Sequence, residues 1–246
     1  MNKNRAQLRL LLVQVRSDQF VKNHEQSCFR AAADVPDSQL VAHDLLEHVL
    51  PENVLPRYDG VIIGGVSDFS ADDMFPNRQS LVRLVEDAQR ERVPIFAACW
   101  GAQFLAGLLG GAVEQDTTCG KVSEIDARLA EAASDDPVFA KLPKEFRAHA
   151  GHNEHITRLP NGGRLLATSD HCPIQAFSLP ETGAYGVQFH PELTLVDAQM
   201  RLNHTLESHP ERRSQIESLL AGLGPTPEAE SIIGSWIDNV VLRPKI

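Results

Sequence analysis

Three short apolar runs restrict the folds open to this chain. Residues 8–15, 61–63 and 93–98 are almost continuously apolar, a pattern typical of strands that are covered on both faces of a sheet. Between the second and third runs, apolar residues recur at the spacing of one helix face. They are Leu81, Leu84, Val85 and Ala88. Strand, helix and strand in this order indicate an α/β domain with a largely parallel central sheet.

Further short strands are predicted over residues 165–168, 175–178 and 184–189, and the last of them leads into His190. No internal repeat or low-complexity tract interrupts the pattern. The proline and glycine residues are scattered as turn markers and are not gathered into a linker. We therefore expect a single domain.

A C-terminal helix is predicted to begin at Thr226, the expected N-cap. Pro227 suits the first helical turn, and Glu228 is an acid placed favourably near the positive end of the helix dipole. One apolar face follows, formed by Ile232, Ile233, Trp236, Ile237 and Val240. We expect a main domain over residues 1–200 and a helical extension over residues 201–246 that packs on the same domain.

Composition excludes several classes of protein. The formal net charge is −10 and no basic run is present, so nucleic acid is not an expected partner. No apolar run approaches the roughly 20 residues needed to cross a bilayer, so no membrane partner is expected. Four cysteines without a C-x-x-C pair fit a reducing compartment, and we expect a cytoplasmic protein. No P-loop is present, and we expect no cofactor and no metal.

Cys99 lies where the third apolar run gives way to a helix. The residues after it carry one apolar helix face, made by Phe104, Leu105, Leu108 and Leu109. A cysteine at such a turn has its sulfur near free backbone N–H groups and the positive end of a helix dipole, which favour the thiolate. The position predicts a reactive thiol.

Backbone N–H groups near Cys99 predict an oxyanion hole. The N–H of Trp100, directly after the nucleophile, is one expected donor. Gly64 and Gly65 follow the strand over residues 61–63 and tolerate unusual backbone dihedrals. We expect Gly65 to be the second donor and Gly64 to lie beside the substrate.

A nucleophilic thiol also needs a base, and that base needs a group to orient it. His190 and Glu192 supply both groups within the segment Gln188-Phe189-His190-Pro191-Glu192. Taken alone, Cys99 would be interpreted as a buried structural cysteine, His190 as a turn residue and Glu192 as a solvated acid. Because each of the two segments needs the other, their combination favours a catalytic interpretation.

The pattern Cys-x-Gly-x-Gln, followed far downstream by Gln-Phe-His-Pro-Glu, resembles the class I (triad) glutamine amidotransferases. The resemblance covers residues 10–195 and is strongest to stand-alone members similar to the glutaminase domain of GMP synthase. It implies a flavodoxin-like, three-layer α/β fold. It also implies that Cys99 attacks the side-chain amide of glutamine, that His190 acts as base and then protonates ammonia, and that Glu192 orients His190.

The resemblance implies roles for further residues. Gly65 and Trp100 would form the oxyanion hole, and Gln103 would contact the bound glutamine. The stretch 120–126, through Glu124, would form a wall of the substrate pocket.

Three functions remain open at this stage. The first is a glutaminase that supplies ammonia to a separate synthase subunit, because the chain has no nucleotide site of its own. The second is a stand-alone hydrolase of another γ-glutamyl amide or peptide. The third, a non-catalytic regulatory module, is disfavoured by the intact Cys99, His190 and Glu192.

A histidine-rich segment invites a metal interpretation. It contains His149, His152, Glu154 and His155, with His171 beyond it. Imidazole and carboxylate groups suit zinc, but the spacing is not a standard ligand pattern. We expect a pocket rim or a partner-facing loop. Cys28, Cys119 and Cys172 belong to no motif, and we expect them to be structural or surface residues.

Overall fold

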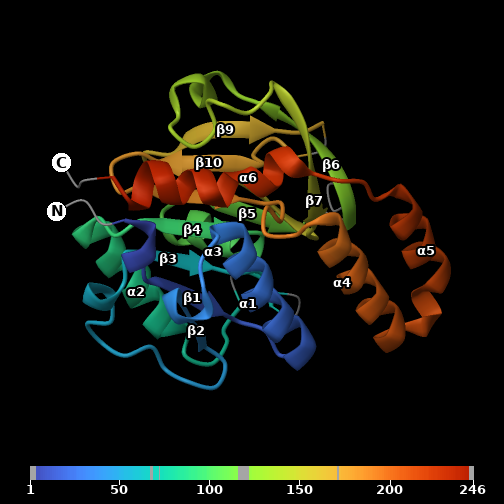
Figure 1. Cartoon of the computed structure of the whole chain (residues 1–246), viewed down its shortest axis with the longest axis horizontal. Coiled ribbons are helices and arrows are strands. Elements are labelled where there is room, and N and C mark those ends of the chain that lie inside the picture. Colours follow the sequence, from blue (N-terminus) through green and yellow to red (C-terminus); the bar gives the residue numbers. More distant parts are fainter. Residues whose placement is uncertain (1–3, 67–68, 72, 116–121, 171, 244–246) are drawn as a thin grey trace.

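The computed structural model describes residues 4–66, 69–71, 73–115, 122–170 and 172–243. Its main sheet has nine strands, and a separate pair is formed by β5 (Ala112–Gln115) and β8 (Glu154–Arg158) (Figure 1). The main sheet has the order β2 (Leu40–Asp44), β1 (Leu10–Gln14), β3 (Gly60–Ile63), β4 (Ile95–Ala98), β11 (Ala184–Val187), β10 (Ala176–Leu179), β9 (Arg164–Thr168), β6 (Val122–Leu129) and β7 (Glu145–Gly151).

The main sheet has a parallel half and an antiparallel half. Strands β2, β1, β3, β4 and β11 pair in parallel, whereas β11, β10, β9, β6 and β7 pair antiparallel. In the parallel half, β4 lies between β3 and β11, with Ile63 opposite Ala97 and Val187 opposite Ala98. The carboxyl ends of these three strands therefore meet at one edge of the sheet.

Helices cover both faces of the parallel half. On one face, α1 (Gln19–Ala33) and α6 (Pro227–Trp236) bury Phe29 and Trp236 against the sheet. On the other face, α2 (Arg78–Glu91) and α3 (Trp100–Leu108) bury Leu81 and Phe104. The resulting helix, sheet and helix layers confirm the predicted α/β fold. The prediction did not resolve the antiparallel half of the sheet.

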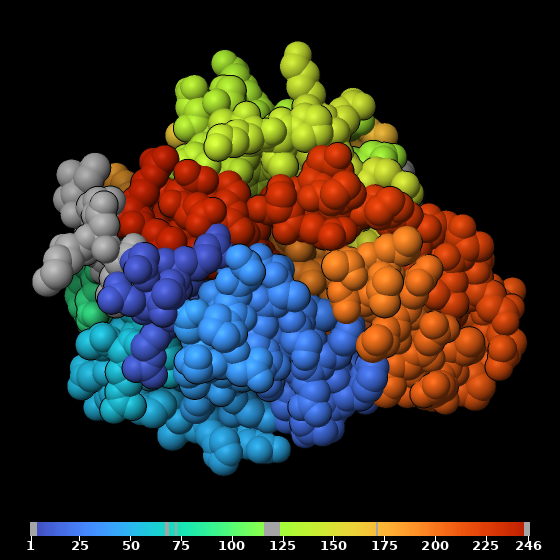
Figure 2. Space-filling model, in the orientation of Figure 1, coloured from blue at the N-terminus to red at the C-terminus, as the bar shows by residue number. Residues whose placement is uncertain are grey.

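Two further helices form a hairpin beside α1. They are α4 (Leu195–Ser208) and α5 (Arg213–Gly222) (Figure 1), and the space-filling view shows this part of the chain, in orange, beside the blue residues of α1 (Figure 2). α4 begins with a capping box in which Thr194 and Asp197 satisfy each other's backbone N–H groups. It contacts α1 through hydrogen bonds from His204 to Asp18 and from His24 to Asp197. The predicted boundary at residue 200 falls inside this helix, and the division of the chain remains a prediction.

The remaining elements are short. The 3₁₀ turns are Arg5–Gln7, Asp37–Gln39, Leu55–Arg57, Glu131–Asp135 and Pro210–Arg212, and a π turn, Ile237–Val241, continues α6. Within the described ranges, no helix combines the length and apolarity needed to cross a membrane.

The C-terminal helix begins where the sequence predicts it, but its cap differs. Thr226 is the N-cap residue of α6 and Pro227 is in the first turn. The Thr226 hydroxyl makes no capping bond to the backbone and instead donates to Glu230 Oε1 at 3.3 Å. α6 is therefore held mainly by its apolar face, where Trp236 meets Phe96 of β4 with ring centroids 5.5 Å apart.

We expect Trp236→Ala to lower the free energy of unfolding by about 3–5 kcal/mol, because it removes a fully buried ring that no small side chain can replace. Urea denaturation followed by circular dichroism measures this loss. The matched control is Val196→Ala on α4, where the side chain is 64% exposed and little change is expected. Equal stability of the two variants would show that α6 does not depend on this contact.

Candidate active site

Cys99 occupies a strained turn between β4 and α3. Its backbone has φ 53° and ψ −116°, a left-handed conformation that costs a non-glycine residue free energy. The turn is held by the Cys99 N–H, which donates to Val187 O at 2.8 Å, and by the Cys99 carbonyl, which accepts from Ala102 N at 3.0 Å. A Cβ atom at Gly101 would lie 2.5 Å from Ile63 O. Only glycine allows α3 to start so close to β3.

His190 and Glu192 follow β11 at the same edge of the sheet. The Nδ1 atom of His190 lies 2.8 Å from Glu192 Oε1, and both side chains are buried. The backbone N–H of His190 donates to His149 O at 2.7 Å, which fixes the turn. Glu192 therefore sets the orientation of the imidazole ring.

Charge around His190 overcomes its burial. Burial alone would lower the pKa of His190, but the negative charges of Glu192 and Cys99 raise it to about 10. Burial would likewise raise the pKa of Glu192, yet the neighbouring His190 holds it below its ordinary value. The pair is thus favoured as an imidazolium and a carboxylate.

Cys99 and His190 open onto one cavity of about 190 Å³. Its walls come from the ends of β1, β4, β7 and β11 and from α1 and α4. The residues that line it are Arg16, Val21, Val66, Cys99, His149, Ala150, Gly151, His190, Leu193, Ala198, Arg201, Leu202, Thr205 and Leu223. The structure therefore brings the predicted nucleophile and base together, with Glu192 behind the base.

The expected oxyanion donors lie at the same edge. Trp100 is the first residue of α3, where helix N–H groups have no partner inside the helix. The N–H of Gly65 donates to Glu25 Oε1 at 3.2 Å, and the N–H of Gly64 donates to Val13 O at 3.1 Å. Gly65 would serve an oxyanion only after releasing Glu25, and its role remains a prediction.

A buried ion pair beside the cavity escaped the sequence analysis. Arg16 donates from Nε and Nη2 to Glu25 Oε1 at 3.0 and 2.8 Å. The carboxylate also accepts from Gln14 Nε2 at 2.8 Å and lies so close to Gly64 that a Cβ there would be 2.7 Å away. The available signal was an arginine directly after the apolar run 8–15.

Gln103 is buried in α3 but does not line the cavity. Its Nε2 atom donates to Glu154 O at 2.7 Å and to Gln188 Oε1 at 3.2 Å. The side chain thereby ties the start of β8 to the end of β11. The Nε2 atom is thus already engaged within the protein, and the contact of Gln103 with glutamine remains a prediction.

Glu124 lies on β6 and faces a different cavity. It forms an ion pair with Arg147 and accepts a hydrogen bond from the backbone N–H of Gly224. That cavity is also lined by Ser218 and Leu219 of α5. Glu124 does not line the cavity of Cys99, and its contact with a substrate remains a prediction.

The histidine-rich segment divides between the cavity and the core. His149 lines the cavity, and neither of its ring nitrogens has a hydrogen-bond partner among the described residues. His152 is buried with Nδ1 2.7 Å from Glu154 O. Within the described ranges, His149, His152 and His155 do not bring ligand atoms together, whereas His24, Cys28 and Asp197 do. His171 and Cys119 lie outside the described residues.

Comparison with known proteins identifies the class of this protein. Residues 18–205 match the family described as glutamine amidotransferase class-I, which covers most of the chain. The chain belongs to this family, as the resemblance of its two motifs predicted.

Among individual proteins, the chain is similar to subunits of GMP synthase. The chain is 33% identical over 149 residues to a subunit of the glutamine-hydrolysing GMP synthase of Archaeoglobus fulgidus, covering 61% of this chain and 74% of that protein. It is also 33% identical over 125 residues to the corresponding GMP synthase subunit of Pyrococcus furiosus, covering 51% of this chain and 64% of the relative's length. The protein is thus a class I glutamine amidotransferase similar to these GMP synthase subunits.

Solved structures support the fold. A glutamine amidotransferase from Thermotoga maritima has a TM-score of 0.76 at 19% identity and covers 96% of this chain and 98% of its own. A putative GMP synthase subunit from Thermoplasma acidophilum has a TM-score of 0.66 at 20% identity, covering 96% of this chain and 94% of its own. At these identities the likeness shows the fold alone.

Two histidines beside the site predict a fold that is labile to acid. Burial lowers the pKa of His149 and of His152 from 6.5 to about 4. Between pH 6.5 and about pH 4 the two histidines bind protons in the unfolded chain but not in the folded chain. Their contribution to the free energy of unfolding is therefore fully present above pH 6.5 and is lost as the pH falls. The loss should reach roughly 3 kcal/mol per histidine near pH 4.

Replacing His149 by leucine should therefore flatten the pH dependence. Urea denaturation at pH 7, 5.5 and 4.5 compares His149→Leu with the parent protein. Leu193→Ala is the matched control, since it changes the same cavity without removing a titrating group. If the free energy of unfolding of His149→Leu fell with pH as steeply as that of the parent protein, the lowered pKa of His149 would not be a source of the acid lability.

Proposed function

We propose that this protein hydrolyses the side-chain amide of glutamine through a γ-glutamyl thioester on Cys99. The observation that carries the proposal is that a thiol on a strained turn and an imidazole held by Glu192 at 2.8 Å open onto one cavity. Membership of the class I glutamine amidotransferase family supports the same reaction.

The proposed chemistry begins from the ion pair of thiolate and imidazolium. Cys99 Sγ attacks the amide carbon, and the oxyanion that forms accepts hydrogen bonds from the Trp100 N–H and from Gly65 after it leaves Glu25. His190 gives its proton to the leaving nitrogen, the C–N bond breaks and ammonia departs. His190 then removes a proton from water, which attacks the thioester and releases glutamate and the free thiolate.

Glu192 serves this cycle without touching the substrate. It holds His190 Nδ1, so that Nε2 is the nitrogen left for the thiol and the substrate. Its charge also raises the pKa of His190, which favours the protonated state needed to expel ammonia.

The names of the relatives indicate where the ammonia would go. Several are named as parts of a glutamine-hydrolysing GMP synthase. We propose by this similarity that the chain delivers ammonia to a separate synthase subunit. The alternative is direct release by a stand-alone hydrolase of another γ-glutamyl compound.

The first test is a substrate panel. Ammonia and glutamate release from glutamine is measured beside the release of amine from γ-glutamyl amides and peptides. Slow, Cys99-dependent turnover of glutamine indicates a glutaminase that requires a partner. Fast cleavage of another γ-glutamyl compound with little glutamine turnover would replace the proposal by the stand-alone hydrolase.

Cys99→Ala should abolish turnover, by about 10⁴-fold or more, because no other group can form the thioester. The variant should keep the circular dichroism spectrum of the parent protein. Cys172→Ser is the matched control, since Cys172 is another buried cysteine but does not line the cavity. Turnover that survives in Cys99→Ala rejects the mechanism.

Glu192→Gln and His190→Ala should both slow turnover, because the carboxylate acts through the imidazole. The remaining turnover of Glu192→Gln should be about 10- to 100-fold higher than that of His190→Ala. The pH profile of kcat/KM gives a second readout. The limb assigned to His190 should move to lower pH in Glu192→Gln, because a charge that raises its pKa is removed. An unmoved profile would contradict the orienting and charging role of Glu192.

A further inference from the structure

Arg201 brings a positive charge to the cavity that holds Cys99. The residue lies on α4 and lines the same cavity as Cys99 and His190. Its Nη2 atom is buried and makes no hydrogen bond within the described part of the chain. Its Nε–H group donates to His24 Nδ1 at 2.9 Å. One end of the guanidinium is thus held while another of its nitrogens has no acceptor among the described residues.

The other buried charges around the cavity have partners of opposite sign. Arg16 pairs with Glu25, and His190 pairs with Glu192. Among the described residues, no carboxylate forms an ion pair with Arg201. Burial of a cation without an anion is costly, and a guanidinium is well suited to bind a carboxylate through two N–H groups. An anion in the cavity would give Arg201 the partner of opposite charge that the described residues do not supply.

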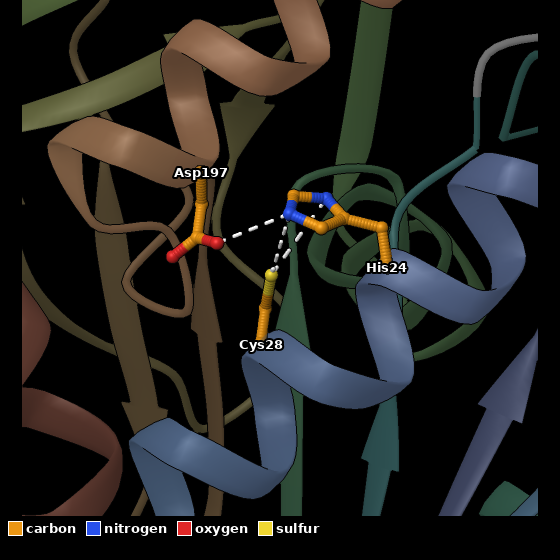
Figure 3. A group of neighbouring side chains, drawn as sticks. All are labelled: His24, Cys28 and Asp197. Carbon is orange, nitrogen blue, oxygen red and sulfur yellow. Dashed lines mark hydrogen bonds and ion pairs between the residues drawn. The ribbon is translucent and has the colours of Figure 1, made fainter.

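A chain of hydrogen bonds positions Arg201. Figure 3 shows His24 and Cys28 on α1 with Asp197 on α4, and His24 Nε2 lies 3.0 Å from Asp197 Oδ1. Since the Nε–H of Arg201 can only donate, His24 Nδ1 accepts and Nε2 carries the proton toward Asp197. Burial and the charge of Arg201 lower the pKa of His24, which keeps the ring neutral and able to accept.

The same contacts weigh against a metal at this cluster. The three residues have ligand atoms within 4.8 Å of one another. However, both ring nitrogens of His24 are already engaged, and burial raises the pKa of the Cys28 thiol far above the range in which it would bind a metal as thiolate. The cluster instead orients the arginine.

Arg16 adds a second guanidinium to the cavity wall. Its Nε and Nη2 atoms are bound to Glu25, and the side chain lines the same cavity as Arg201. Burial and the charge of Arg16 lower the pKa of Arg201, whereas the charges of Glu25 and Glu192 act in the opposite direction, so the two cations lie within electrostatic reach of each other. An anion between them would be attracted by both.

We propose that Arg201, supported by Arg16, binds a carboxylate of the substrate in the Cys99 cavity. The inference rests on the proposed function and names the part of the substrate that is recognised. Two carboxylates have the required chemistry: the α-carboxylate of the γ-glutamyl group, and a carboxylate on the amine that leaves. Both are singly charged oxygen acceptors that a guanidinium binds in the same way.

Kinetics of Arg201→Gln distinguish the two sources. Glutamine, γ-glutamylmethylamide and γ-glutamylglycine share the α-carboxylate, but only the last has a carboxylate on its leaving amine. Loss of a charged hydrogen bond should raise KM about 10- to 100-fold with a smaller change in kcat. A rise for all three substrates assigns the α-carboxylate, and a rise for γ-glutamylglycine alone assigns the leaving group. Unchanged KM for all three would overturn the proposal.

Controls separate this result from misfolding. Arg213→Gln on α5 removes an exposed arginine that pairs with Glu217 and should leave KM unchanged. Arg201→Met tests the same loss of charge with an unbranched apolar side chain, in case Arg201→Gln folds poorly. Arg201→Lys keeps a charge but lacks the forked donor, and it should recover part of the lost affinity.

A binding measurement separates failure of this proposal from failure of the proposed function. Calorimetry with Cys99→Ala measures binding of glutamate and of γ-glutamylglycine without turnover. Binding that is lost in Cys99→Ala/Arg201→Gln supports the carboxylate site even if no substrate is cleaved by the parent protein. Binding that is unaffected by Arg201→Gln, or absent for both compounds, would overturn the carboxylate site.

Discussion

The left-handed backbone at Cys99 is the constraint on which the rest of the site depends. A non-glycine residue in such a conformation costs about 1–3 kcal/mol, and the surrounding fold must hold it. β11 does so through Val187 O, which accepts the Cys99 N–H, and β3 does so through the close approach of Gly101 to Ile63 O. The thiol therefore projects from the sheet edge only while β3, β4, β11 and α3 remain in register. The position of this thiol is therefore set by four elements acting together.

The mixed sheet explains how two residues far apart in the chain, Cys99 and His190, come to open onto one cavity. Strands β2, β1, β3 and β4 alone would leave the second edge of β4 unpaired. The antiparallel strands β10 and β11 bring the chain back, so that β11 pairs in parallel with β4 and antiparallel with β10. His190 follows shortly after Gln188, whose side chain is bound to Gln103 and to Ile156 N. The antiparallel half also supports His190 directly, because His149 O on β7 accepts the His190 N–H.

Patterns of a few neighbouring residues were enough to predict the buried strands and the two motifs that contain Cys99 and His190. Buried parallel strands are continuous apolar runs, and the strand end at His190 lies within a short motif. The strand β6 was missed because charged residues such as Asp126 and Arg128 interrupt its apolar pattern. The positions of Gln103 and Glu124 could not be predicted from spacing, because their partners lie in distant strands and loops. Arg201 and its acceptor are 177 residues apart, a pairing that only the tertiary fold creates.

The short link between Glu192 and α4 couples the position of that helix to the contact between Glu192 and His190. Thr194 caps α4 only two residues after Glu192, and Asp197 in the first turn is anchored to His24 on α1. A displacement of α4 that widens the cavity would also pull the carboxylate away from His190. The width of the cavity and the orientation of His190 therefore depend on the same short segment of chain. A thioester exposed to bulk solvent in the widened state would face an imidazole that has lost its orientation.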